Sequence, residues 1–110
     1  MKTTKLYRPI NLEELILIEE SFWKRIPIRL GGWQPILYVV SNLEYAEEIL
    51  TKWYIPSGID GYIICCEVNS EFLSKYNVEN ADGKIHNEYW IPADDVDEFN
   101  NNLIGYIQVL

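Results

Sequence analysis

The chain has 110 residues and a formal net charge of −8 at pH 7, and 14% of its residues are aromatic. This length predicts a single domain, residues 1–110, because it can supply one hydrophobic core but not two. The negative charge repels phosphate backbones and therefore disfavours nucleic acid as a partner. The large share of rings indicates a core or a groove built from aromatic side chains.

The first half of the chain predicts a strand, a helix, a loop, a strand and a second helix. Residues 5–10 are typical of a strand, and Asn11 followed by Glu14 predicts a helix start, with the helix running to about residue 21. The inward stripe of this helix would be Leu15, Ile18 and Phe22, opposite a wet face of glutamates that includes Glu14. Residues 22–35 contain two prolines and a Gly-Gly pair, which predict an extended loop and, because long loops are uncommon in small domains, a functional candidate.

Residues 36–40 predict a short buried strand, and the segment after them predicts a helix. Ser41 and Glu44 have the spacing of a capping box, and the helix is expected to reach about Tyr54. Its apolar stripe places Trp53 in the core; the full stripe is Leu43, Ala46, Leu50 and Trp53.

The second half of the chain is mostly strands. Residues 61–68 form the most hydrophobic run and predict a central strand, Asn69 predicts the cap of a short helix to about residue 75, and residues 76–79 predict another strand. A turn at 80–83, a strand at 86–92, an acidic helix or turn at 93–102 and a last strand at 103–110 follow. This order predicts an α+β fold.

Two adjacent cysteines and the polar start bear on the compartment. Cys65 and Cys66 would point to opposite faces of a strand and have no metal-ligand spacing, which predicts free, buried or half-buried thiols in a reducing cytosol. The first residues lack a hydrophobic signal region, and no stretch approaches the roughly eighteen apolar residues of a membrane span. We therefore expect a cytoplasmic protein without a membrane partner.

Glu88 is the single carboxylate in an otherwise aromatic and apolar strand. Alternation along the strand places Glu88 and Trp90 on one face and Tyr89 and Ile91 on the other. Two interpretations stay open. Glu88 either points to solvent at a sheet edge or lies in a ring-walled cleft, where partial burial would equip it for acid, base or electrostatic work.

Three landmarks occur in the order found in a known family. They are Leu6-Tyr7-Arg8 at the end of the first strand, the strand Ile36–Ser41 followed by Tyr45-Ala46 in a helix, and a strand with Glu88 shortly before Pro92. In this order, which covers nearly the whole chain, the sequence resembles ADP-ribosyltransferases of the cholera-toxin type, and in particular small bacterial ADP-ribosylation-related proteins. The resemblance implies a compact fold of mixed or antiparallel sheets with two or three short helices.

The resemblance also implies a ligand and residue roles. NAD or an ADP-ribose-like dinucleotide would be bound, without a metal, and the activity would be transfer of ADP-ribose to a protein acceptor or hydrolysis of NAD. Glu88 would be the catalytic carboxylate that stabilises the ribosyl cation. The dinucleotide-binding residues would be Arg8 on the phosphates with Tyr7 beside it, an aromatic slot of Tyr38, Tyr45 and Trp33, and His86 two residues before Glu88.

An alternative class of function fits the same composition. Each site residue has a structural interpretation as well, because Arg8 can pair with a carboxylate and the tyrosines can be core rings. A non-catalytic acidic interaction module, such as an immunity or antitoxin protein, would use the charge of −8 and its rings to cover a basic protein partner. The acidic run 94–98 is better explained as a solvated helix face than as a metal site, because no His or Cys lies near it.

Overall fold

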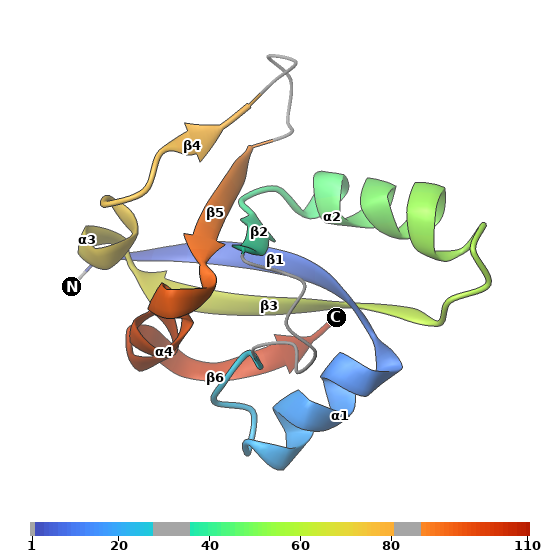
Figure 1. The fold of residues 1–110 in the computed structure, drawn as a ribbon, viewed down its shortest axis with the longest axis horizontal. Helices are drawn as coiled ribbons and strands as arrows, with labels where there is room; N and C mark the ends of the chain where they lie inside the picture. The colour runs from blue at the N-terminus through green and yellow to red at the C-terminus, as the bar shows by residue number, and fades with distance from the viewer. Residues whose placement is uncertain (1, 28–35, 81–86) are drawn as a thin grey trace.

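The computed structural model describes residues 2–27, 36–80 and 87–110. The strands are β1 (Thr3–Asn11), β2 (Ile36–Val40), β3 (Gly61–Asn69), β4 (Val78–Glu79), β5 (Glu88–Pro92) and β6 (Leu103–Val109). The helices are α1 (Leu12–Glu20), α2 (Leu43–Ile49), α3 (Ser70–Leu73) and α4 (Val96–Asn101), with a π-helical turn (Leu50–Tyr54) after α2 and a 3-10 turn (Ala93–Asp95) before α4. Together the strands form one antiparallel sheet in the order β4-β5-β2-β1-β3-β6 (Figure 1).

The predicted α+β class is confirmed. The described residues form a single antiparallel sheet and four α-helices, where the resemblance implied two or three helices and left mixed sheets open. The hydrophobic run 61–68 is an interior strand, β3, but it lies one strand from the edge formed by β6. Among all the described residues, no helix is long and apolar enough to cross a bilayer.

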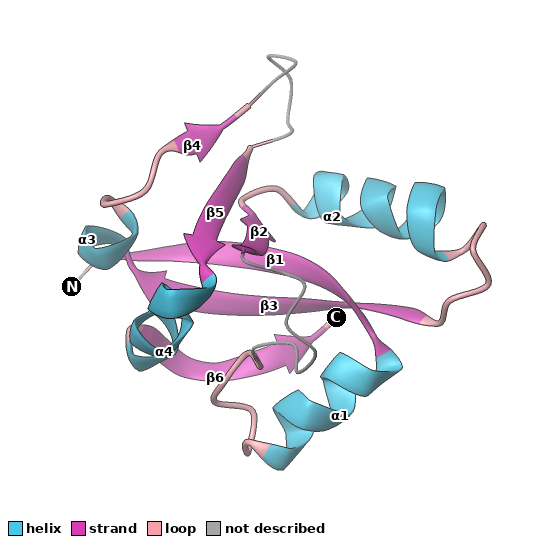
Figure 2. Cartoon of the chain, viewed as in Figure 1, coloured by secondary structure: helices cyan, strands magenta, loops and turns pink. Residues whose placement is uncertain are grey.

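The sheet buries a large core on one face and a small one on the other. The large core includes Ile18 of α1, Phe72 of α3 and Phe99 of α4. The small core, centred on Val40, Ala46 and Ile63, lies beneath α2. In Figure 2, α2 accordingly lies at the upper right, apart from the other three helices.

Two long ladders are joined by a short one in the middle of the sheet. β1 and β3 are in register from Thr3 opposite Asn69 to Asn11 opposite Gly61, and β2 and β5 pair along the whole of both strands. The register between β1 and β2 is Tyr7 opposite Val40. The strands therefore part on either side of this pair, and backbone groups there need other hydrogen-bond partners.

The first helix begins as predicted, but its inward face differs. The side chain of Asn11 accepts a hydrogen bond from the backbone N–H of Glu14 at 2.9 Å, as an N-cap does. Phe22, expected inside, is 78% exposed. Phe22 and Trp23 have φ values of 62° and 63°, so the chain leaves the helix in the left-handed region and Trp23 takes the place against the core.

The second helical segment extends to Tyr54, as predicted, but its N-cap residue and the exposure of Trp53 differ from the prediction. Its N-cap is Asn42 and not Ser41, because the Asn42 side chain accepts from the N–H of Tyr45. Trp53, expected in the core, is 68% exposed. The stripe was drawn with an α-helical period, whereas residues from Leu50 follow a π-helix, whose wider turn rotates Trp53 outward.

Candidate functional site

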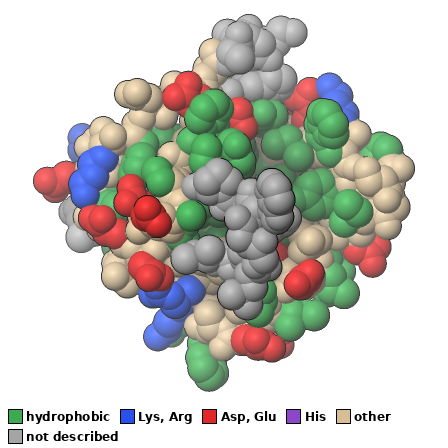
Figure 3. Space-filling model, in the orientation of Figure 1, with side chains coloured by type: hydrophobic (Ala, Val, Ile, Leu, Met, Phe, Trp, Pro, Cys, Tyr) green, Lys and Arg blue, Asp and Glu red, His purple; other side chains and the backbone are tan. Residues whose placement is uncertain are grey.

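A cavity of about 720 Å³ opens where β1 and β2 part, beneath α2 and its π-helical turn. Its lining comes from four parts of the chain and consists of Arg8, Pro9, Tyr38, Val40, Tyr45, Ile49, Trp53, Tyr54 and Glu88. In Figure 3, hydrophobic side chains gather around a hollow in the upper half of the view, between β5 and α2 as Figure 1 places them. Its volume is that of a ligand site and exceeds a packing defect in a core.

The guanidinium of Arg8 forms one end of the cavity and is held by the fold. Its Nε and Nη2 donate to the two carboxylate oxygens of Glu14 at 2.8 and 2.9 Å, and its Nη1 donates to the carbonyl oxygen of Tyr38 at 2.8 Å. The side chains of Arg8 and Glu14 are only 9% and 2% exposed. The pair therefore connects β1 to α1 and neutralises the charge of Arg8. Arg8 also gives the carbonyl oxygen of Tyr38 a hydrogen-bond donor at the point where β1 and β2 separate.

Aromatic rings make the walls. The rings of Tyr38 on β2 and Trp90 on β5 meet edge to face, with centroids 5.9 Å apart and an interplanar angle of 75°. The hydroxyl of Tyr54 donates to the carbonyl oxygen of Pro9 at 3.1 Å, which fixes the π-helical turn against β1. Exposed fractions of 39% for Tyr38 and 68% for Trp53 leave ring surface of the lining open to a ligand, whereas Trp90 supports Tyr38 from outside the lining.

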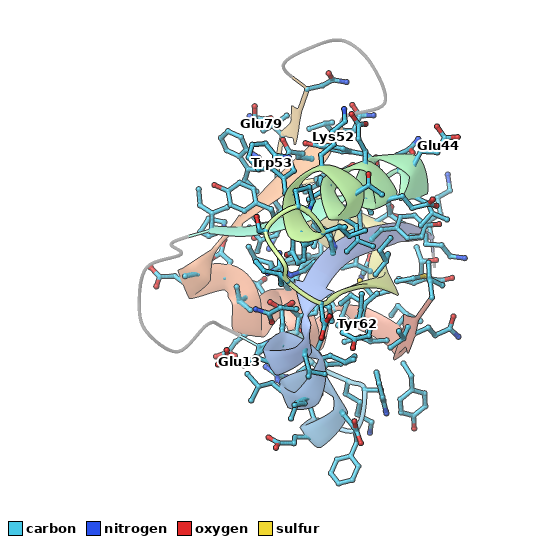
Figure 4. All side chains as sticks on the ribbon, turned by 90° about the vertical axis from the view of Figure 1, so that its right-hand side faces the viewer. Glu13, Glu44, Lys52, Trp53, Tyr62 and Glu79 are labelled. Atoms are coloured by element: carbon cyan, nitrogen blue, oxygen red, sulfur yellow. The ribbon has the colours of Figure 1, made fainter. Side chains whose placement is uncertain are left out.

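Two carboxylates lie next to each other at the β4–β5 side of the cavity. Glu88, half-buried, lines it, and Glu79 is directly opposite Glu88 in the ladder, so both side chains leave the same face of the sheet as Val40. In Figure 4, Glu79 lies just above Trp53, and Lys52 lies beside Trp53 on the helix. The Lys52 ammonium is paired with Glu48 one turn earlier. Among described residues the cavity lining contains one guanidinium, that of Arg8, which is bonded to Glu14, and one carboxylate, that of Glu88.

The structure brings together part of the predicted set. Arg8, Tyr38, Tyr45 and Glu88, far apart in sequence, line one cavity. Tyr7 is half-buried and packs against the small core under α2, and it does not line the cavity. Trp33 and His86 fall outside the described residues.

Sequence reasoning missed the residues that decide what the cavity can bind. Glu14 was assigned to the wet face, although it follows Arg8 by six positions and a strand–helix corner of that length brings the two side chains together. Trp53 was placed in the core, and Tyr54 was not predicted to line the cavity, because no sequence signal marked the π-helical turn. The opposition of Glu79 and Glu88 depends on a strand pairing across residues 81–86 and had no sequence signal.

Other ionisable groups lie outside the cavity. Cys65 and Cys66 are free and buried, as predicted. Burial raises the pKa of the Cys66 thiol to about 12 and also raises the pKa of Cys65, so both thiols stay protonated at neutral pH. Burial and a 2.8 Å hydrogen bond to Asp95 raise the pKa of Tyr76. In the described ranges there is no group of three or more His, Cys, Asp or Glu side chains that could hold a metal ion.

Comparison with known proteins adds no assignment to this geometry. No protein-family model, curated protein or solved structure matches the chain.

Proposed function

We propose that this chain is a non-catalytic acidic module that binds a basic protein partner through the cavity between β2, β5 and α2. The observation that carries the proposal is the net charge of −8 together with the exposed rings at the cavity. Trp53 and Tyr38 of the lining are 68% and 39% exposed, and the guanidinium of Arg8 is already bonded to Glu14. A positively charged group fits this arrangement better than an anion does.

The net charge of −8 supports the same proposal, because it would speed the approach of a basic partner.

The test is direct binding of defined peptides. A set of basic peptides and a set of acidic peptides of equal length are titrated calorimetrically into the protein at low and at high NaCl. We expect the basic set to bind, with affinity that falls as salt rises. The double variant Glu79→Gln/Glu88→Gln should bind at least about tenfold more weakly, because hydrogen bonds to charged groups are lost.

A matched control separates a local effect from loss of overall charge. Glu13→Gln/Glu20→Gln removes the same charge from exposed positions of α1, and Glu13 lies far from Trp53 and Glu79 (Figure 4). This control should retain most of the affinity. Equal binding of acidic and basic peptides, or equal weakening in both double variants, would contradict the proposal.

A dinucleotide remains the second candidate. It is supported by the presence of Arg8, Tyr38, Tyr45 and Glu88 in one cavity, as the resemblance to ADP-ribosyltransferases implies. The Arg8–Glu14 pair weighs against it, because a diphosphate carries two negative charges and needs an unneutralised cation. Millimolar NAD should raise the melting temperature of the native protein, but not of Tyr38→Ala, if this candidate is right.

A further inference from the structure

We infer that the group of the basic partner that enters the cavity is a large apolar side chain, such as that of phenylalanine, and that the basic side chains beside it stay at the water-exposed rim. We call the entering side chain the anchor. This inference rests on the proposed function and names the part of the partner that the cavity itself takes. It follows from the character of the lining, the engagement of its polar groups and the charge of the helix beside it.

The surface of the cavity is mostly apolar. Val40 and Ile49 are aliphatic, and four further lining residues carry rings, namely Tyr38, Tyr45, Trp53 and Tyr54. Val40 is buried and Trp53 is exposed, so the lining reaches from the sheet to the molecular surface. A cavity of about 720 Å³ with such walls gains affinity chiefly by burying apolar surface of its ligand.

Four polar side chains of the lining already interact with other groups of the protein. All three guanidinium nitrogens of Arg8 donate to protein oxygens, and so does the hydroxyl of Tyr54. Tyr45 and Glu88 are engaged as well. A polar group that enters the cavity gives up hydrogen bonds to water and must compete with these existing interactions, which costs free energy. An apolar side chain has no such loss, so the lining favours an apolar anchor.

The charge of the helix beside the cavity indicates that basic groups flank the anchor. Residues 43–54, which form α2 and its π-helical turn, contain three glutamates and one lysine, and this lysine, Lys52, is paired with Glu48. Glu44 and Glu47 are exposed on the same helix. Long basic side chains can keep their charged ends in water at the rim while they are attracted to these carboxylates. The anchor thus supplies affinity, and the flanking cations supply orientation and speed of association.

The experiment compares peptides that differ only at their central position. Acetylated pentapeptide amides Lys-Lys-X-Lys-Lys, with phenylalanine, alanine or glutamine at X, are titrated calorimetrically into the full chain at low and at moderate NaCl. The phenylalanine peptide should bind at least about tenfold more tightly than the alanine peptide, because a large apolar side chain is removed from water. The glutamine peptide should bind no more tightly than the alanine peptide, because its amide is desolvated on entry.

Salt separates the anchor from the flanking charges without any change in the protein. The affinity of each peptide should fall as NaCl rises, because exposed charges are screened. The ratio of the phenylalanine and alanine affinities should change by less than about twofold, because apolar burial is not screened. Binding of the phenylalanine peptide should also have the more negative heat-capacity change. Equal affinities of the three peptides, or a ratio that vanishes with salt, would overturn the inference.

Trp53→Ala tests the place of the anchor. The position is 68% exposed, so the variant should keep its fold. It should weaken binding of the phenylalanine peptide at least about threefold and leave binding of the alanine peptide unchanged, because the lost contact involves the anchor. Tyr106→Ala is the matched control, since it removes a ring that is 64% exposed on β6 outside the lining, and should change neither affinity. Equal weakening of both peptides by Trp53→Ala would count against the inference.

Failure of this inference can be told from failure of the proposed function. If the phenylalanine and alanine peptides bind equally and both weaken in Glu79→Gln/Glu88→Gln, the anchor is wrong and the basic-partner function stands. If a phenylalanine peptide with serine in place of every lysine binds as tightly as the basic one, the anchor stands and the basic-partner function is wrong. If no peptide of the set binds, both are wrong.

Discussion

The guanidinium of Arg8 stabilises the fold through its hydrogen bonds to Glu14 and Tyr38. It bonds both oxygens of Glu14 and the carbonyl of Tyr38 in a setting where both charged side chains are nearly inaccessible to water. Replacing Arg8 removes two charge-assisted hydrogen bonds from the buried Glu14 carboxylate, and breaking a buried pair in this way costs far more than the pair itself contributes. Loss of a ligand in an Arg8 variant would therefore report unfolding as readily as lost binding.

Arg8→Met is expected to lower the free energy of unfolding by about 3–5 kcal/mol, measured by urea denaturation, because the buried Glu14 carboxylate loses the two hydrogen bonds that Arg8 donates. The double variant Arg8→Met/Glu14→Leu should recover most of this loss. Arg25→Met, which breaks the exposed pair with Asp97, should cost at most about 1 kcal/mol. An Arg8→Met loss as small as that of Arg25→Met would show that the two hydrogen bonds from Arg8 contribute little to stability.

At the scale of elements, the π-helical turn after α2 sets the shape of the cavity. It turns Trp53 toward solvent and places Tyr54 against β1. Gly61 at the start of β3 permits this approach: a Cβ there would lie 2.2 Å from Cδ1 of Leu50 and 3.0 Å from Cδ2 of Tyr54. Absence of a side chain at one strand position thus allows the helix to pack directly on the sheet.

Gly61→Ala is expected to destabilise the protein by about 1–3 kcal/mol, because an added methyl group overpacks this contact. The variant should also shift the NMR signals of Trp53 and Tyr54. Adding Leu50→Ala makes room for the methyl group, so the two changes should be coupled in a double-mutant cycle of unfolding free energies. Strictly additive effects would contradict the proposed contact.

At the scale of the whole molecule, the net charge of −8 leaves unbalanced repulsion among seventeen acidic side chains. NaCl screens exposed charges and has little effect on the buried Arg8–Glu14 pair. We expect the melting temperature to rise between low salt and about 0.5 M NaCl, even though the affinity for basic peptides falls over the same range. A melting temperature that falls with salt would mean that surface ion pairs outweigh the repulsion.

The strand and helix order was largely predictable from sequence because it depends on local signals. Asn11 and Asn69 mark helix starts by capping, and the alternation in β5 correctly separates Trp90, with its ring on Tyr38, from the fully buried Ile91. Phe22 and Trp53 were placed wrongly because a left-handed backbone and a π-helix interrupt the period on which the prediction relied.

By itself the sequence determined the α+β class, most element positions and the free, buried state of Cys65 and Cys66, because capping, alternation and hydrophobic runs act between near neighbours in the chain. Only the tertiary structure decided that Arg8 is neutralised by Glu14 and that Glu79 stands opposite Glu88. Both outcomes depend on which strands pair and where two of them part. These are long-range contacts, and the identity of a residue does not reveal which distant charge will lie beside it.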